Sequence, residues 1–203
     1  MTRTITKTLY QFDELTDRAK ETARQWWRDL EAQDFDTECT ISDAVECARL
    51  IGIEIDGTPN RPSVYWSGFW SQGDGASFTG RYAYVKGAAK AIREHAPQDI
   101  ELHKIADALQ DAQRRNFYRL EAVATQSGRY VHSHTMSVDV EDSNDSYRDI
   151  GNAEDDVRDA LRSFADWIYR QLEKEYEYTM SDENVDESIR INEYEFDETG
   201  ALA

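Results

Sequence analysis

Residues 64–84 read VYWSGFWSQGDGASFTGRYAY, and this stretch decides the fold that the sequence predicts. Aromatic and β-branched side chains on both flanks are typical of β-strands. The centre, residues 71–77, is polar, and its Gly73-Asp74-Gly75 sequence permits the backbone conformations of a tight turn. We therefore expect an antiparallel hairpin around which the rest of the chain is arranged.

A second hairpin is expected further along the chain. Residues 117–125 alternate between apolar and polar side chains, residues 126–129 are typical of a turn, and residues 130–140 form the returning strand. Together with the helices, the two hairpins predict a single α+β domain over residues 1–203. In this domain an antiparallel sheet built from two hairpins carries helices packed on it.

Helical spacing of apolar residues predicts helices at 17–32, 40–50, 86–96, 102–112, 153–176 and 182–189. Thr16 and Ser181 are expected to cap two of them. Strands are expected at residues 3–10 and 53–56. The tail, residues 192–203, is expected to fray unless Tyr194 and Phe196 hold part of it down.

Negative charge is concentrated in the last third of the chain. Of the net charge of −18, residues 139–203 contribute −15, with 21 acidic and 6 basic side chains. Such a field repels nucleic acid and anionic membranes and attracts basic protein surfaces. The composition therefore argues against direct binding of nucleic acid and favours a basic protein partner.

The sequence also predicts the compartment and the state of the cysteines. It has neither a long apolar run typical of a membrane span nor the features of a secretion signal, so we expect a cytoplasmic protein. Cys39 and Cys47 lie eight residues apart on one predicted helix, about 12 Å, which is too far for a disulfide. Two buried free thiols are expected.

The loop of the first hairpin is one candidate site. Its backbone amides can form a concavity for an anion, with Trp66, Trp70 and Tyr82 stacking on a base. In that interpretation the phosphate or ribose is held by four polar residues, Ser71, Gln72, Asp74 and Ser77. The alternative is a tight turn in which Asp74 and Gln72 satisfy the local backbone.

A pair of histidines is a weaker candidate for a metal site. His132 and His134 lie two residues apart on the predicted returning strand, so both imidazoles would lie on its apolar face and could bind one metal ion. The alternative is a pair of hydrogen-bonded core histidines beside Tyr130. Apart from this pair, the sequence contains no arrangement that predicts a metal site, a cofactor or a catalytic centre.

Acidic side chains outside the apolar stripe of the longest predicted helix form the candidate partner surface. They are Asp155, Asp156, Asp159, Asp166 and Glu173. Such a row is typical of a solvated helix face, and it is also what a mimic of the DNA phosphate array or a docking surface for a basic protein requires.

Several segments are similar to a family of accessory proteins from bacteriophages and prophages, sometimes labelled antitoxin-like. The segments are YQFDEL at 10–15, WSGFWSQGDGASF at 66–78, LQDAQRRNF at 109–117 and IYRQLEKEYEY at 168–178. The resemblance implies a phage accessory gene that acts in the cytoplasm of a bacterial host. It implies no particular activity and no site residues.

The sequence therefore leads to three hypotheses of function. The first is a non-enzymatic acidic protein that inhibits or sequesters a host protein, as a counter-defence inhibitor of the anti-CRISPR or DNA-mimic kind. The second is a protein or enzyme that binds a nucleotide or other small molecule at the aromatic hairpin. The third is an antitoxin that pairs with a basic toxin.

Overall fold

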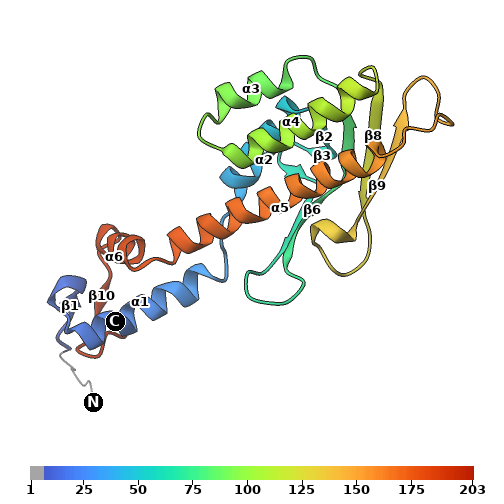
Figure 1. Ribbon diagram of the computed structural model, residues 1–203. Helices are drawn as coiled ribbons and strands as arrows, with labels where there is room; N and C mark the ends of the chain where they lie inside the picture. The colour runs from blue at the N-terminus through green and yellow to red at the C-terminus, as the bar shows by residue number, and fades with distance from the viewer. Residues whose placement is uncertain (1–6) are drawn as a thin grey trace. The chain divides into compact units, whose positions relative to one another are not determined.

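The computed structural model describes residues 7–203, which form two compact units (Figure 1). The terminal unit contains residues 7–36 together with residues 174–203, and the central unit contains residues 37–173. Helices and antiparallel strands make up both units, so the predicted α+β class is confirmed. None of the helices in this described part combines the length and the apolar composition needed to cross a bilayer.

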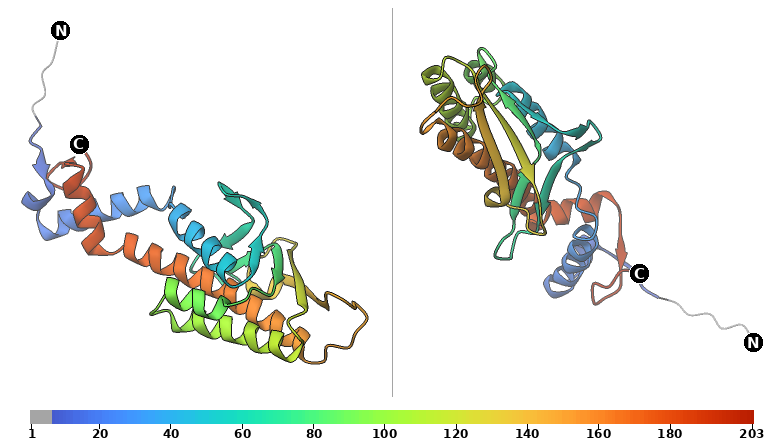
Figure 2. Two further views of the ribbon diagram at one scale, coloured as in Figure 1. Left: turned by 90° about the horizontal axis from the view of Figure 1, so that it is seen from above. Right: turned by 90° about the vertical axis from the view of Figure 1, so that its right-hand side faces the viewer.

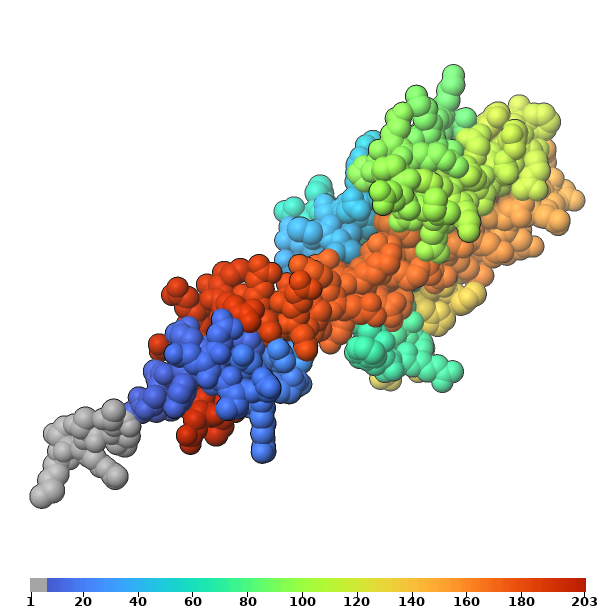
Figure 3. Space-filling model, turned by 60° about the vertical axis from the view of Figure 1, so that its left-hand side comes forward, coloured from blue at the N-terminus to red at the C-terminus, as the bar shows by residue number. Residues whose placement is uncertain are grey.

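The terminal unit joins the two ends of the chain. Its elements are β1 (Tyr10–Gln11), the 3-10 helix η1 (Phe12–Glu14), α1 (Asp17–Glu31), α6 (Asp182–Ile191) and β10 (Glu195–Phe196). Strand β1 pairs antiparallel with β10, and Figure 3 shows the blue N-terminal and red C-terminal segments packed together. Of the strand predicted at residues 3–10, residues 3–6 lie outside the described part and only Tyr10 belongs to β1.

The core of the terminal unit draws on both ends of the chain. Its buried residues are Phe12, Leu15, Ala19, Ala23, Trp27, Val185, Ile189 and Phe196. Phe196 is completely buried and contacts the edge of the Trp26 ring. The tail is therefore not frayed over this part, because Tyr194 and Phe196 hold it down by packing on Trp26, which is the exception that the sequence allowed.

The predicted helix caps are present in the terminal unit. The side chain of Thr16 accepts a hydrogen bond from the backbone N–H of Ala19 at 3.3 Å. Ser181 accepts one from the N–H of Asn184, also at 3.3 Å. Each hydroxyl satisfies one of the N–H groups that the first turn of a helix leaves unpaired.

The central unit contains the sheet. Its elements in chain order are α2 (Glu38–Leu50), β2 (Ile53–Ile55), β3 (Gly57–Thr58), β4 (Arg61–Pro62), β5 (Val64–Ser67), β6 (Gly75–Phe78), β7 (Gly80–Ala83), α3 (Ala88–His95), α4 (Ile100–Arg115), β8 (Leu120–Gln126), η2 (Ser133–Thr135), β9 (Met136–Asp142) and α5 (Ala153–Thr179), whose last residues belong to the terminal unit.

One extended segment, residues 75–83, links the two hairpins. Its first half, β6, pairs with β5, as the sequence predicted for the first hairpin. After Thr79 the second half, β7, pairs with β2 on one side and β8 on the other. The second predicted hairpin is β8–β9, so the main sheet has the antiparallel order β2-β7-β8-β9.

Helices cover one face of this sheet. In the right-hand view of Figure 2 the helices of the central unit lie behind and beside the strands of this sheet, and the face toward the viewer carries none of the described helices. Phe78 of the adjoining strand β6 packs edge to face with Phe164 of α5, with 5.9 Å between the ring centroids. The predicted stripe of α5 is confirmed, since its members Val157, Leu161, Phe164, Ile168 and Leu172 are all buried.

Two local predictions about the central unit are corrected. Strand β8 begins only at Leu120, because Phe117 and Tyr118 have φ angles of 57° and 61°, which do not fit a strand. Cys47 is buried but Cys39 is exposed. Eight residues at about 100° each turn a helix by two turns and roughly 80°, so the two thiols point in different directions.

Candidate functional site

The loop between β5 and β6, residues 68–74, is closed by its own aspartate. Asp74 Oδ2 accepts hydrogen bonds from the backbone N–H groups of Trp70 at 3.0 Å and Ser71 at 2.6 Å. A Cβ atom at Gly68 would lie 2.7 Å from the same oxygen, so the carboxylate also needs a glycine opposite it. These contacts support the tight turn rather than the ligand loop.

The remaining polar residues predicted for this loop do not converge on one point. Ser77 lies in β6, completely buried, and its hydroxyl has no hydrogen-bond partner among residues 7–203. Gln72 is exposed at the tip of the loop. A phosphate or ribose held by both side chains would therefore have to reach from the tip into the core.

The aromatic residues predicted to stack on a base are also separated by burial. Tyr82 is only 3% exposed, and burial raises its pKa to about 12. Trp66 stacks on Phe69 at 5.4 Å, whereas Trp70 is 81% exposed. The predicted role of Tyr82 is wrong, because a ring inside the core cannot stack on a ligand.

The two histidines do not form the predicted pair on a strand. His132 is half-buried, His134 is exposed, and Ser133 between them is buried. The segment 133–135 is the 3-10 helix η2, and β9 starts only at Met136. Successive side chains of a 3-10 helix turn by about 120° instead of alternating, so the two imidazoles do not project from one strand face as predicted. The two rings still lie close together, edge to face, with centroids 6.2 Å apart.

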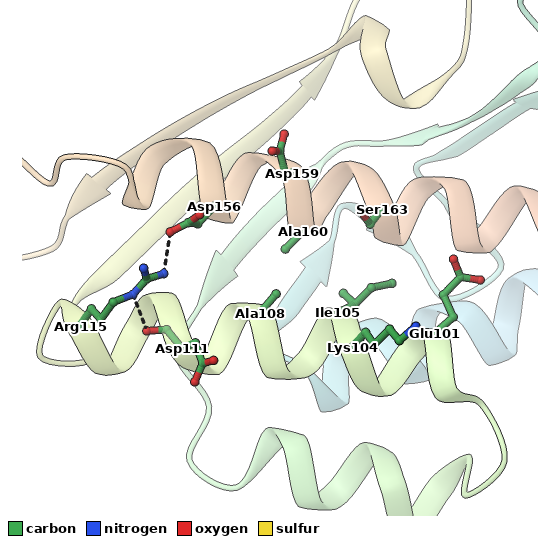
Figure 4. A pocket seen from close by; sticks show the side chains of 10 residues that line it. All are labelled: Glu101, Lys104, Ile105, Ala108, Asp111, Arg115, Asp156, Asp159, Ala160 and Ser163. Carbon is green, nitrogen blue, oxygen red and sulfur yellow. Dashed lines mark hydrogen bonds and ion pairs between the residues drawn. The ribbon is translucent and has the colours of Figure 1, made fainter.

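The predicted partner-binding residues of α5 are partly neutralised. Asp156 forms an ion pair with Arg115 of α4 at 2.6 Å (Figure 4), and Asp155 pairs with Arg158 at 2.6 Å. No ion pair to Asp159, Asp166 or Glu173 occurs in the described chain. The row is thus less negative than the sequence indicates.

A cleft of about 470 Å³ lies between α4 and α5, and Figure 4 shows the side chains that line it. They are Glu101, Lys104, Ile105, Ala108, Asp111, Arg115, Asp156, Asp159, Ala160 and Ser163. Arg115 bridges the two helices at one end, and Glu101 forms an ion pair with Arg170 at the other. Ion pairs engage Glu101, Arg115 and Asp156, and Asp111 pairs with Arg114, so the field that the cleft offers to a ligand is weakened.

The uncovered face of the main sheet carries the charges that the sequence analysis missed. We call it the outer sheet face and define it by Glu54, Arg81, Glu121, Val123, Asp139 and Glu141, all of which are exposed. Strand alternation produces it: the neighbours Ile53, Tyr82, Ala122 and Val138 point into the core. These residues line a depression of about 710 Å³, with Ser146 from the loop after β9 at its margin.

Register places like charges side by side on this face. Glu121 of β8 lies directly opposite Glu141 of β9, and Val123 lies between Arg81 and Asp139 in the next row. In the part of the chain that the structure describes, none of the four carboxylates forms an ion pair. Like charges directly opposite destabilise a sheet, typically by about 0.2–1 kcal/mol.

A weak signal for this face is present in the sequence. Glu121 and Glu141 alternate with apolar residues on the two strands of the second hairpin, but their pairing depends on the register. The register follows from the turn, and the returning strand begins at Met136, six residues after its predicted start. Glu54 lies in the nearly neutral first part of the chain, so the distribution of net charge did not indicate an acidic site there.

Fold and surface together define an acidic α+β protein with one bare, negatively charged sheet face. The chain matches the family described as Domain of unknown function (DUF8835) over residues 36–182, and it belongs to that family. The matched range contains the whole central unit and hence the outer sheet face. No curated protein and no solved structure matches the chain.

Proposed function

We propose that this protein is a non-enzymatic acidic binding protein that docks its outer sheet face on a basic surface of another protein and thereby inhibits or sequesters it. The observation that carries the proposal is the opposition of Glu121 and Glu141 on an uncovered sheet. This arrangement costs stability in the free protein, and a cationic partner would relieve the repulsion.

The chemistry of the face favours lysine and arginine side chains as its ligands. Four carboxylates surround one guanidinium, Arg81, in a depression that is open to solvent. The overall charge of −18 would add long-range attraction and speed the encounter. Affinity should therefore fall steeply as salt is added.

The biological setting follows from the resemblance to phage accessory proteins. In a bacterium infected by a phage, the partner would be a cytoplasmic host protein whose basic surface binds nucleic acid, for instance a component of a defence system. Occupying that surface is the action of a counter-defence inhibitor of the DNA-mimic or anti-CRISPR kind. An antitoxin would use the same surface but would bind a toxin instead.

The experiment compares two variants with equal charge change. Glu121→Lys/Glu141→Lys alters the outer sheet face, and Glu183→Lys/Glu187→Lys alters exposed carboxylates of α6. Each tagged protein is used to capture partners from the bacterial host, and the affinity for the purified partner is then measured at low and high salt.

We expect the wild type and the α6 variant to bind one basic protein in a salt-sensitive way. The outer-face variant should lose at least tenfold in affinity. Equal affinity and equal salt dependence of all three proteins would contradict the proposal. A small molecule that copurifies with the wild type and is lost in Asp74→Ala would instead favour the nucleotide-binding alternative.

A further inference from the structure

Three side chains of different chemistry converge between α2 and α3, away from the outer sheet face. Asp43 and Cys47 lie one helical turn apart on α2, which places them on the same side of that helix. His95 is the last residue of α3. One ligand atom from each residue lies within 4.8 Å of the other two.

The contacts within this cluster come close to those of a tetrahedral metal centre. His95 Nε2 lies 3.2 Å from Asp43 Oδ1, and Cys47 Sγ lies 4.0 Å from Asp43 Oδ2. Around a zinc ion with bonds of about 2.0–2.3 Å, neighbouring ligand atoms lie about 3.3–3.5 Å apart. Small changes of rotamer would bring the three donors to these distances.

The thiol lies in a negative field that a cation would complement. Cys47 is 1% exposed, and among residues 7–203 the one hydrogen-bond contact of its thiol is the long one to Asp43. Burial, followed by the charges of Asp43, Asp99 and Glu46, raises the pKa of the Cys47 thiol to about 12. An unactivated thiol of this kind does not serve as a nucleophile, but a bound divalent ion would displace its proton to solvent.

Two neighbouring carboxylates are already engaged. Glu46 accepts hydrogen bonds from Arg49 Nε at 2.8 Å and Nη2 at 2.6 Å. Asp99 accepts from the backbone N–H of Leu102 at 2.9 Å and from Trp167 Nε1 at 2.7 Å. Neither carboxylate is therefore available as a further ligand. Asp43 and His95 face solvent, with side chains that are 60% and 35% exposed, whereas Cys47 is buried.

We propose that Asp43, Cys47 and His95 bind a zinc ion whose fourth ligand is water. A thiolate and an imidazole beside one carboxylate select zinc over magnesium or calcium, which prefer oxygen ligands. The bound ion clamps the end of α3 to α2. It requires no residue of the outer sheet face, so the proposed function and this site can be tested separately.

The test is a titration of chelator-treated, reduced protein with zinc chloride, followed by calorimetry and metal analysis. Substitution with cobalt(II) reports on the thiolate through its sulfur-to-metal charge-transfer band. His95→Gln and Cys47→Ala remove one ligand each. The matched controls His134→Gln and Cys39→Ala change exposed residues of the same types outside the cluster.

We expect one zinc ion per chain with a Kd in the micromolar range or below for the wild type and both controls. Each ligand variant should bind at least tenfold more weakly, and Cys47→Ala should lose the cobalt–thiolate band. His95 is exposed, so its variant keeps the fold, which circular dichroism verifies. Binding only at millimolar zinc, or unchanged binding in His95→Gln, would overturn the proposal.

Discussion

At the scale of single residues, the buried carboxylate of Asp142 is expected to stabilise the fold more than an exposed carboxylate does. Asp142 at the end of β9 is 2% exposed, and it accepts hydrogen bonds from Asn144 N–H at 3.0 Å and Arg148 Nη1 at 2.5 Å. The backbone hydrogen bond from Asn144 and the pairing with Arg148 lower the pKa of Asp142 below its usual value of 3.8. The ionised form is therefore bound more favourably in the folded state.

A carboxyl group with a lowered pKa stabilises the fold at pH values above its unfolded pKa. This contribution disappears as the pH falls through the folded pKa. We predict that Asp142→Asn lowers the thermal midpoint by several degrees at pH 7, and that the difference from the wild type shrinks steadily below about pH 4. Thermal unfolding followed by circular dichroism across a pH series measures this difference, with exposed Glu187→Gln as the control. A difference independent of pH would contradict the prediction.

Asp74 tests the two interpretations of the hairpin loop. Asp74→Ala removes both hydrogen bonds to Trp70 and Ser71, so we predict a loss of about 1–2 kcal/mol in the free energy of unfolding. Because the carboxylate serves the loop itself, partner affinity should stay within twofold of the wild type. Urea unfolding and a binding titration measure both quantities, and intact stability with abolished binding would point to a ligand loop.

At the scale of secondary-structure elements, the packing of α5 on the sheet stabilises the central unit. Phe164 is completely buried between the rings of Phe78 and Trp167, with centroids 5.9 Å and 5.5 Å away. We predict that Phe164→Ala costs about 3–5 kcal/mol in the free energy of unfolding. Tyr147→Ala, at a side chain that is 97% exposed, should cost less than about 0.5 kcal/mol in the same urea experiment.

Pairing of strands β8 and β9 gives a second prediction at this scale. Glu121→Gln removes the like-charge contact with Glu141, so the free protein should gain about 0.2–1 kcal/mol in stability. Under the proposed function the same change weakens partner binding. Urea unfolding and a binding titration therefore move in opposite directions. Exposed Glu177→Gln, outside the sheet, should change neither, and a loss of both stability and affinity in Glu121→Gln would contradict the argument.

Local sequence patterns predict helices and strands better than they predict the tertiary contacts between them. The caps at Thr16 and Ser181 and the buried stripe of α5 follow from spacings of a few residues. The cluster of Cys47 with His95 depends on how α2 packs against α3, two helices separated by 37 residues of chain. Such contacts arise from tertiary packing, and no local pattern encodes them.

The candidate surface illustrates the same limit. Asp155 and Asp156 lie outside the apolar stripe, as predicted. Their ion pairs with Arg158 and Arg115 were not predicted. Arg115 comes from another helix, so its neutralising effect required the packed structure. The outer sheet face in turn required the register of β7, β8 and β9, which a shift of one residue would have inverted.

At the scale of the whole molecule, the acidic last third of the chain belongs to both units. Residues 139–173 complete the central unit, whereas residues 174–203 build half of the terminal unit. Its β10 strand holds β1, and its Phe196 fills the core there. The boundary at residue 139, where the charge changes, therefore does not coincide with the boundaries of the two structural units.

Truncation after residue 193 tests the role of the tail. Without Phe196 and β10 the core of the terminal unit is open, so we predict much faster amide hydrogen exchange in α1. The amides of β7 and β8 in the central unit should keep their protection, because their partners are unchanged. Hydrogen exchange followed by mass spectrometry measures both, and unchanged protection of α1 would show that the tail contributes little.

The joining of both chain ends in the terminal unit has a consequence for synthesis on the ribosome. Phe12 and Trp27 emerge first, but their core partners Val185, Ile189 and Phe196 are made last. At about 5–20 residues per second, the interval between them is on the order of 8–30 s. During this time the apolar face of α1 lacks its packing partners, so nascent chains should depend on chaperones until α6 and β10 have been synthesised.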